Sequence, residues 1–507
     1  MPDLIPLSTL PDDGRLRRIV IVGGGSAGWM AAAALSRITS TPIVLIESDE
    51  IGTVGVGEAT IPQIRTFNQA LGLDEREFLR ETKGTFKLGI RFLGWNGEGS
   101  DYSHAFGQVG RHSGIVPFHQ MWIRAHHRGL AASFDAYSLN DVAARAGKMA
   151  MPGAGLSPQG VNMPWAYHFD ASLYAAYLRR LAEANGVTRV EGKVAGVSVG
   201  TDGQTITGLT VDDGGFLEGD FFLDCTGFRG LLISELQGSE FCDWSKWLPC
   251  NSALAAPCSS DKPTTPYTTS TAHKAGWIWR IPLQHRVGNG IVYCSDVMDD
   301  DEAHRLLLAQ MDRSPDVEPR QIRFTTGTRR QHWIGNCLAI GLSAGFLEPL
   351  ESTSIHLTQY SIARLMAMLP RRSIDPVMQS AFNDEISRQW LRVRDFLILH
   401  YWANGRTGEP FWDACRDCEL PGTLKSKIAQ FRAAGHFIRE DDELFTEVAW
   451  AQVFIGQGLI PENWNPLADE IDEKQLRESL ETIRHQHEQL VANMPSHDQF
   501  IQGFIQA

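Results

Sequence analysis

The stretch RRIVIVGGGSAGWMAAAAL, residues 17–35, combines residue types and spacing that suit a phosphate-bearing ligand. A short apolar run leads into three glycines, Gly23, Gly25 and Gly28, and an alanine-rich segment follows. The glycines permit a tight turn, a close approach of backbone to a pyrophosphate, and close packing of helix on strand. The next apolar run, PIVLIES, ends near Glu47, where an acid would take ribose hydroxyls. The pattern predicts a dinucleotide site that includes Ser26 and Ala27; a glycine-rich turn without a ligand is the alternative.

Two later segments favour FAD over NAD as the dinucleotide. FFLDCTGFRG (221–230) and CLAIGLSAGF (337–346) each lead an apolar strand into a glycine-bearing turn. They resemble the late FAD-contacting segments of flavoprotein monooxygenases. The sequence has no second unit of strand, GxGxxG and helix. We therefore expect one FAD site, with reducing equivalents that arrive from outside the chain.

Lys87 lies in TFKLGIRF, which alternates apolar residues with others and predicts one strand over 85–92. Phe86, Leu88, Ile90 and Phe92 would share one face, so that Lys87 projects from the other. A solvated lysine on a strand is one interpretation of this pattern. A buried amine that serves as a nucleophile or a hydrogen-bond donor is the other.

Two tryptophans, Trp277 and Trp279, stand two positions apart in GWIWRIPL. The flanking isoleucines and Pro282 favour a short strand, in which both indoles lie on the same face. Core packing explains such a pair by itself, because tryptophan carries a large apolar area. A wall beside a reaction site is the second explanation.

Glu351 precedes a segment whose apolar spacing predicts a helix over 352–369, ended by Pro370. A carboxylate at that place is consistent with an ordinary helix cap. The backbone N–H groups of Thr353 and Ser354 at the helix start could also hold an anion.

These segments together resemble the flavin-dependent halogenases of the tryptophan-halogenase family. The family hallmark Trp-x-Trp-x-Ile-Pro is matched by GWIWRIPL. Four further segments follow the family order along most of the chain: VGVGEATIP (54–62), GTFKLGIRF (84–92), HAFG (104–107) and GFLEPLESTSIH (345–356). The combination is specific, although each segment alone would be weak.

The resemblance implies a two-component chemistry. FADH2 from a separate flavin reductase reacts with oxygen to give a flavin hydroperoxide, which oxidises halide to hypohalous acid. The acid is guided to Lys87, and Glu351 stabilises the cationic intermediate of an aromatic substrate. Implied halide contacts are Thr353 and Ser354; implied substrate contacts are His104, Phe106, Trp277, Trp279 and Trp450. Implied cofactor contacts beyond the glycine loop and Glu47 are Glu58, Ala59, Val194, Leu342 and Ile355.

The sequence departs from the tryptophan-accepting members at two places. Ser354 replaces the usual glycine of Glu-Ser-Thr-Gly, which leaves the choice between bromide and chloride open. Residues 431–461 contain no tyrosine, whereas those members use a Tyr-Tyr pair there to grip the amino-acid part of the substrate. Phe445 and Trp450 could cover a ring. We therefore expect an indole-type substrate rather than free tryptophan, with a carrier-bound pyrrole or phenol as the less favoured alternative.

Composition narrows the class of protein. The net charge of −14 argues against a nucleic-acid partner, and no apolar run reaches the length of a membrane span. The one CxxC, Cys415 and Cys418, lacks the second pair that a zinc site would need, so no metal is expected. We expect a cytoplasmic protein, and a homodimer is left open.

The chain divides by pattern into two parts. Residues 1–370 mix strands, glycine turns and helices, as expected of a discontinuous, Rossmann-like FAD-binding domain of the flavoprotein monooxygenase type with a substrate-facing sheet. Residues 371–507 look helical and would form a cap over the substrate. The predicted class is α/β with α+β character. Two other functions compete with halogenation: an FAD-dependent aromatic hydroxylase and a flavin-binding protein without catalysis.

Overall fold

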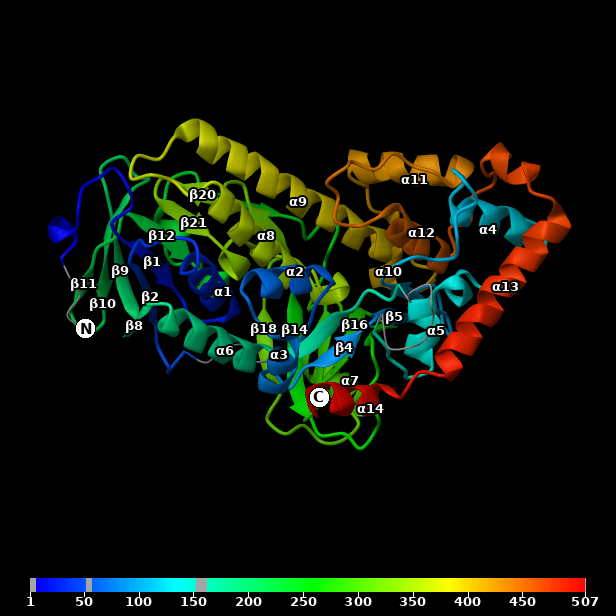
Figure 1. Cartoon of the computed structure of the whole chain (residues 1–507). Coiled ribbons are helices and arrows are strands. Elements are labelled where there is room, and N and C mark those ends of the chain that lie inside the picture. The colour runs from blue at the N-terminus through cyan, green and yellow to red at the C-terminus, as the bar shows by residue number, and fades with distance from the viewer. Residues whose placement is uncertain (1–5, 52–56, 152–161, 507) are drawn as a thin grey trace.

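The computed structural model describes residues 6–51, 57–151 and 162–506. Two large sheets lie on one side of the molecule and beneath the long helix α9, and a group of helices occupies the other end (Figure 1). α9 (Pro376–Trp402) contacts both parts, because it packs on α8 and β20 and also on α10, α11 and α12. This helix therefore connects the glycine-loop region with the helical end.

The sheet that carries the glycine loop has six strands in the order β20-β21-β12-β1-β2-β8. All neighbours from β21 to β8 are parallel, and β20 is antiparallel to β21. The strands are β1 Ile19–Val22, β2 Ile43–Glu47, β8 Thr188–Glu191, β12 Phe221–Asp224, β20 Trp333–Ile334 and β21 Cys337–Ala339. β1 and β12 are buried throughout, as expected of central strands in a parallel sheet covered by helices. This arrangement confirms the predicted α/β class with a Rossmann-like sheet.

The second large sheet has seven strands in the order β18-β14-β17-β16-β15-β5-β6. Its strands are β5 Gly89–Leu93, β6 Asp101–Ala105, β14 Ser252–Cys258, β15 Thr268–His273, β16 Gly276–Pro282, β17 Val287–Tyr293 and β18 Arg320–Arg323. β16 is the strand expected for GWIWRIPL. Its Ile278 packs with Ile291 and Leu307 of α7, whereas Trp277 and Trp279 belong to the main core on the opposite face.

The strand predicted over 85–92 is in fact two strands of different sheets. β4 (Thr85–Lys87) belongs to a three-stranded sheet, β3-β7-β4, and β5 starts at Gly89 in the seven-stranded sheet. Leu88 between them donates its backbone N–H to the carbonyl of Pro266 at 2.7 Å. The alternation of residue types predicts extended structure on both sides of Leu88, but it does not reveal that the backbone changes partners there.

Three small sheets complete the strands. They consist of β3 Gly57–Ala59, β4 and β7 Ala166–Asp170; of β9 Val194–Val199, β10 Ile206–Val211 and β11 Phe216–Leu217; and of β13 Phe241–Asp243, β19 Gly327–Arg329 and β22 Gly345–Phe346.

The helices before α9 are α1 Ser26–Leu35, α2 Gln63–Ala70, α3 Glu75–Glu81, α4 Phe118–His127, α5 Leu139–Arg145, α6 Ala171–Ala184, α7 Asp300–Gln310 and α8 Ser354–Ala367. After α9 follow α10 Pro410–Asp417, α11 Gly422–Ala434, α12 Glu447–Gly456, α13 Glu473–Ala492 and α14 His497–Gln506. Short 3-10 turns cover Leu7–Thr9, Phe134–Tyr137, Gly227–Arg229, Ile233–Glu235, Gly341–Ser343, Pro349–Glu351 and Pro466–Glu470.

Two features of these helices bear on the site and on the class of protein. α14 returns to β4, where the ring of His497 accepts the backbone N–H of Phe86 at 3.2 Å. Within residues 6–51, 57–151 and 162–506, none of the helices combines the length and the apolar character needed to cross a membrane.

Candidate active site

Lys87 is fully buried at the end of β4, so the interpretation as a solvated lysine is wrong. Its Nζ donates a hydrogen bond to Oγ of Ser352 at 2.7 Å and lies 5.5 Å from the centre of the Phe106 ring. Burial lowers the pKa of Lys87 to about 7, and the charge of Glu351 acts in the opposite direction. The amine is thus poised between its charged and neutral forms near neutral pH.

Glu351 ends the 3-10 turn Pro349–Glu351 and is also buried. Its Oε2 is 2.7 Å from Nδ1 of His104, and its Oε1 is 2.7 Å from Nε2 of His400. Burial by itself would raise the pKa of Glu351, but the charges and hydrogen bonds of His104 and His400 outweigh it and lower the pKa to about 2. The carboxylate is therefore ionised at neutral pH.

Glu351 does not cap α8, so the alternative interpretation as an ordinary helix cap is wrong, and the helix is shorter than predicted. α8 begins at Ser354 and ends at Ala367, with Thr353 as its N-terminal flanking residue. Ser352 separates Glu351 from the helix and has a left-handed backbone with φ of 58°. This conformation is uncommon for a residue other than glycine. The turn directs Glu351 to the histidines and leaves the Ser352 hydroxyl to accept from Lys87.

The predicted halide residues lie at the amino end of α8. Thr353 is fully buried, and its Oγ1 has no hydrogen-bond partner among the residues that the structure describes. Ser354 donates its hydroxyl to the carbonyl of Leu347 at 3.5 Å. A buried unpaired hydroxyl at a helix amino end fits an anion, because both the hydroxyl and the helix N–H groups can donate to it.

Trp277 and Trp279 stand together as the sequence predicts, with ring centres 6.0 Å apart. Trp279 faces Gly290 of β17, where a Cβ would lie only 2.0 Å from its ring. Trp277 donates its indole N–H to Oε2 of Glu348 at 2.8 Å. The ring of Trp279 packs directly against Gly290, and the ring of Trp277 is oriented by its hydrogen bond to Glu348. Both rings are therefore held in position.

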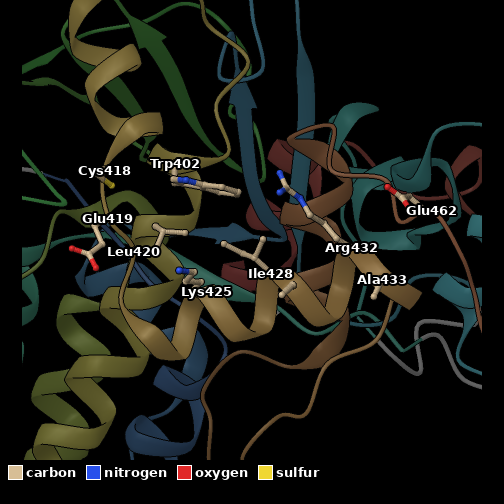
Figure 2. Close-up of a pocket in the computed structure, with 10 residues that line it drawn as sticks. Trp402, Cys418, Glu419, Leu420, Lys425, Ile428, Arg432, Ala433 and Glu462 are labelled. Atoms are coloured by element: carbon tan, nitrogen blue, oxygen red, sulfur yellow. The ribbon is translucent and has the colours of Figure 1, made fainter.

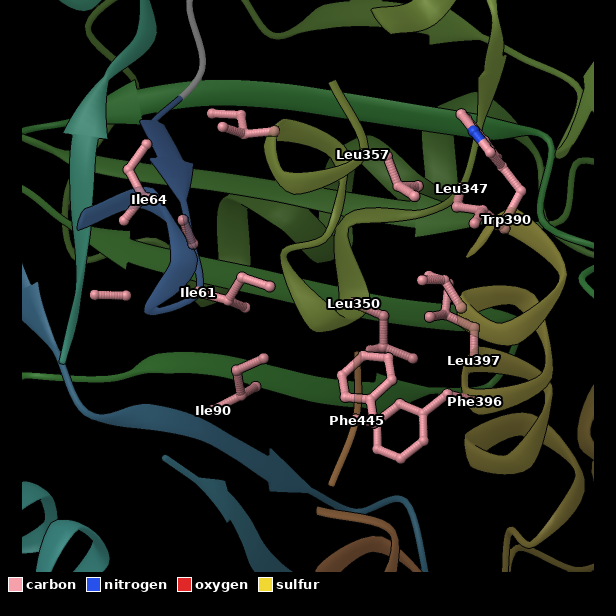
Figure 3. Close-up of a cluster of buried hydrophobic side chains, with 14 of the residues drawn as sticks. Ile61, Ile64, Ile90, Leu347, Leu350, Leu357, Trp390, Phe396, Leu397 and Phe445 are labelled. Carbon is pink, nitrogen blue, oxygen red and sulfur yellow. The ribbon is translucent and has the colours of Figure 1, made fainter. Parts of the chain in front are cut away.

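Aromatic side chains surround the histidine side of Glu351. The rings of Phe396 and Phe445 stack on each other (Figure 3), with centres 3.7 Å apart. The ring of His104 lies 5.5 Å and 5.9 Å from them. Trp450 packs edge-on against Phe396 at 4.9 Å. Of the predicted substrate residues, His104 and Trp450 thus lie around Phe396 and Phe445, between β6, α9 and α12, whereas Phe106 lies beside Lys87.

The glycine loop has the shape that a dinucleotide needs. A Cβ would meet the carbonyl of Cys225 at 2.3 Å on Gly23 and the carbonyl of Gly23 at 1.9 Å on Gly28, so both glycines are required by close packing. On Gly25 a Cβ would meet no heavy atom within 4 Å among the described residues, which leaves space on the side where a pyrophosphate would approach. α1 then starts at Ser26 without a side-chain cap from any described residue.

The acid at the end of β2 lies beside this loop. Oε2 of Glu47 is 1.3 Å from the place a Cβ would take on Gly24, and Oε1 of Glu47 accepts from Arg189 at 2.7 Å. The loop and its acid therefore form the cradle that FAD would require.

The other predicted cofactor residues approach this loop to different degrees. Leu342 lies in the 3-10 turn Gly341–Ser343, and a Cβ on Gly341 would be 2.8 Å from Cβ of Ala27. Ile355 is on α8, which packs on α1. Val194 is the first residue of β9 and follows Gly192 by two positions; the N–H of Gly192 donates to the carbonyl of Glu47.

Glu58 and Ala59 lie on β3, where burial raises the pKa of Glu58 to about 7. Residues 54–56 of the VGVGEATIP segment lie outside the described residues.

Three residues of this region were not predicted from the sequence. Ser352 and Glu348 both lie in the segment GFLEPLESTSIH (345–356), but their residue types alone indicate no role for them there. The contacts of His400 and Glu348 have no local signal, because their partners, Glu351 and Trp277, lie 49 and 71 positions away in the chain. Long-range pairing of this kind has no local pattern.

The described residues contain no metal-binding group, and a surface groove lies apart from Lys87 and Glu351. The part of the chain that the structure describes contains no group of His, Cys, Asp and Glu that could hold a metal ion, and its cysteines are free. A groove of about 570 Å³ opens between the end of α9 and α11 (Figure 2). Its lining is Trp402, Cys418, Glu419, Leu420, Lys425, Ile428, Ala429, Arg432, Ala433 and Glu462, and hence not the segments of Lys87 and Glu351.

Comparison with known proteins identifies the family of the chain. A sequence model of the tryptophan halogenase family matches residues 18–473. The tryptophan 6-halogenase ThaL of Streptomyces albogriseolus is 35% identical over 89% of this chain and 91% of that protein.

Two solved structures are similar over almost the whole chain. The flavin-dependent halogenase Xcc4156 of Xanthomonas campestris is 44% identical with a TM-score of 0.93 and covers 97% of this chain and 98% of its own. The flavin-dependent halogenase BrvH of Brevundimonas sp. BAL3 is 44% identical with a TM-score of 0.92, over 97% of this chain and 100% of its own. With a family match over most of its length, the chain belongs to the tryptophan halogenase family and is a flavin-dependent halogenase.

Proposed function

We propose that this halogenase takes FADH2 from a separate flavin reductase and uses hypohalous acid to halogenate an electron-rich, indole-type ring at Lys87. The observation that carries the proposal is the contact of the buried Lys87 amine with Ser352, the neighbour of the ionised Glu351. An amine donor and a carboxylate at one buried place suit an electrophilic substitution, in which positive charge develops on a ring.

FAD would be held by the glycine loop from Gly23 to Gly28, by Glu47, and by the segments of Leu342 and Ile355 that lie against this loop. Bound in reduced form, the flavin would supply, with oxygen, the power to oxidise a halide. Thr353 and Ser354 would hold that halide at the amino end of α8, where the Thr353 hydroxyl is unpaired among the described residues. Chloride and bromide both fit this donor set.

Lys87 and Glu351 then have different roles in the substitution. The amine of Lys87 binds the oxygen of hypohalous acid and keeps the halogen directed at the ring. A bond forms between the halogen and a ring carbon, the bond between halogen and oxygen breaks, and the hydroxide takes a proton from the charged form of Lys87 and leaves as water. Glu351 stabilises the cationic ring and accepts the proton that the ring carbon loses. His104 and His400 hold the carboxylate in place for both tasks.

The substrate pocket would be formed by His104, Phe106 and Trp450, with Phe396 and Phe445 as further aromatic walls. Residues 431–461 contain no tyrosine to grip an α-amino acid. Indole itself, or an indole without the amino-acid part, is therefore the proposed substrate class. The Trp277 and Trp279 pair would keep that substrate away from the flavin. A cytoplasmic location would give access to reduced flavin.

One assay tests the proposal. The protein is supplied with a flavin reductase, FAD, NADH, oxygen, indole and either bromide or chloride, and products are read by mass spectrometry. We expect halogenated indole, no product from Lys87→Ala, and FADH2 oxidation that persists in that variant. An oxygenated product that forms without halide would indicate an aromatic hydroxylase instead. Tryptophan converted faster than indole would refute the substrate assignment.

A further inference from the structure

Glu348 is a fully buried carboxyl group that the chemistry described above does not use. It lies in the link between β22 and the 3-10 turn that ends at Glu351. Its Oε2 accepts two hydrogen bonds, one from the indole N–H of Trp277 at 2.8 Å and one from the hydroxyl of Tyr401. Its Oε1 is buried and has no partner among the residues of the described ranges. The carboxyl group thus ties the tryptophan strand to α9.

The side chain of Tyr401 is itself fixed by aromatic contacts. The connection from Trp277 through Glu348 to Tyr401 is therefore held at both ends. Its ring stacks on Trp412 with centres 5.7 Å apart and meets Trp95 edge-on at 5.6 Å. Its neighbour in α9 is His400, which contacts Glu351. The ring orientation of Trp277 is therefore connected, through Glu348 and Tyr401, to the helix that also positions Glu351.

A buried carboxyl group at this place is energetically unfavourable, and this indicates that it has a specific role. Burial raises the pKa of Glu348 to about 7, although Trp277 and Tyr401 both act against this rise. Burial of such a group away from water opposes folding, and an apolar residue of similar volume would avoid that penalty. An indole has only one hydrogen-bond donor, so the acceptor that meets it decides how the ring is turned.

We propose that Glu348 is a positioning residue that fixes the ring of Trp277 and so keeps the oxidising halogen species on its way to the substrate, an inference that rests on the function proposed above. Trp277 is chemically an indole, the same kind of ring as the proposed substrate. Held by its N–H and packed against Trp279 at 6.0 Å, it presents little reactive carbon to a passing molecule. A ring released from Glu348 can turn, and hypohalous acid can then replace a hydrogen on one of its carbons by halogen, with water as the other product.

The test uses the full-length protein with the reductase system and compares Glu348→Gln with Glu348→Leu. Glutamine keeps a carbonyl oxygen for Trp277 and Tyr401, whereas leucine has a similar size and no acceptor. We expect Glu348→Gln to retain most of the halogenated product formed per FADH2 oxidised. We expect that ratio to fall about tenfold in Glu348→Leu, since small losses of orientation have large effects on such ratios. Peptide mass mapping of Glu348→Leu should also show halogen on Trp277.

The chain offers a matched control. Glu75 accepts from the indole N–H of Trp165 at 2.8 Å and from the hydroxyl of Tyr167, which is the same pair of donors at a place away from the tryptophan pair. Glu75→Leu should lose stability for the same chemical reason but keep its product ratio and an unmodified Trp277. A general effect of broken hydrogen bonds would lower the ratio in both variants and would overturn the proposal.

Other outcomes also decide. A folded Glu348→Leu that binds FAD and retains the wild-type ratio with unmodified Trp277 overturns the proposal. If that variant does not fold, Trp277→Phe removes the donor instead of the acceptor, and a wild-type ratio there overturns it equally. A wild-type protein that forms no halogenated product would refute the proposed function, which is a separate result from the comparison of Glu348 variants.

Discussion

Lys87 donates a 2.7 Å hydrogen bond to the hydroxyl of Ser352, a residue 265 positions further along the chain. This bond brings an amine from the end of β4 to the turn that carries Glu351. The contact explains why a lysine is tolerated without solvent: a hydroxyl accepts from it, and a carboxylate lies close enough to raise its pKa. The predictions below follow from this contact and from those around it.

Lys87→Met should abolish halogenation and yet stabilise the fold at neutral pH. The pKa of Lys87 is about 7 in the folded protein against an ordinary 10.5. Between these values the unfolded chain binds one more proton than the folded one, so the free energy of unfolding of the wild type rises with pH in that window. Below pH 7 both states are protonated, and the folded wild type bears the full penalty of the buried charge.

The measurement is urea unfolding of both proteins from pH 6.5 to 9.5. The advantage of Lys87→Met should be largest at pH 7 or below and should shrink as pH rises, by at most about 1.4 kcal/mol per pH unit. A constant difference across the series would show that Lys87 has an ordinary pKa. Lys83→Met serves as the control, because it removes a nearby lysine that is exposed to solvent.

Glu351→Gln should lower the rate of halogenation about 100-fold or more, because an amide provides neither the negative charge nor the base. Oxidation of halide should continue, since the altered group lies on the substrate side with His104 and His400. The measurement is halogenated indole formed together with free hypohalous acid captured by a chemical trap. Equal losses of both would place Glu351 in halide oxidation and contradict its assignment.

Thr353→Val should raise the KM for halide about tenfold with a smaller effect on the KM for indole. The change removes one hydroxyl that is buried without a partner among the described residues, and a hydrogen bond to an ion contributes roughly 1.5–3 kcal/mol. Steady-state rates at varied bromide and chloride provide the measurement. Thr358→Val is the control on the same helix, because that hydroxyl is occupied by the carbonyl of Ser354.

Gly290→Ala should destabilise the protein by about 1–3 kcal/mol and lower the product formed per FADH2, because the new methyl group would lie 2.0 Å from the present position of the Trp279 ring. Gly196→Ala is a suitable comparison, since a Cβ on that strand glycine would meet its nearest atom only at 3.8 Å. Thermal unfolding and the product ratio are measured for both. A Gly290→Ala protein with the wild-type ratio would mean that the orientation of Trp279 does not matter.

Local patterns predicted the elements well where one stretch of chain contains the whole reason for its structure. The glycine loop and β16 are of this kind, since turn geometry and alternation act within a few residues. The boundary at Leu88 has no local signal, because Leu88 donates its N–H to Pro266, which is far away in sequence. The helix expected from 352 begins at 354 because Ser352 takes a left-handed conformation.

The resemblance indicates which residues form the candidate site, but it does not indicate their contacts. Lys87 and Glu351 were identified through the resemblance, whereas composition and spacing alone favoured a solvated lysine and a helix cap. Burial decides the chemistry of both groups, and burial depends on β7, α9 and β6, which lie far from them in the chain. His400 and Glu348 could not be identified from their own segments, because each acts only through a contact with a residue on another element.

The change of partners at Leu88 has a mechanical consequence. Lys87 is the last residue of β4 in one sheet, and Gly89 is the first residue of β5 in another. The amine therefore lies at a junction between two sheets that Leu88 alone connects. Heating that loosens this junction would move Nζ of Lys87 away from Ser352 while both sheets are still intact. Halogenation should then fail at a lower temperature than the one at which the fold melts, and that interval measures how tightly the two sheets are fitted together.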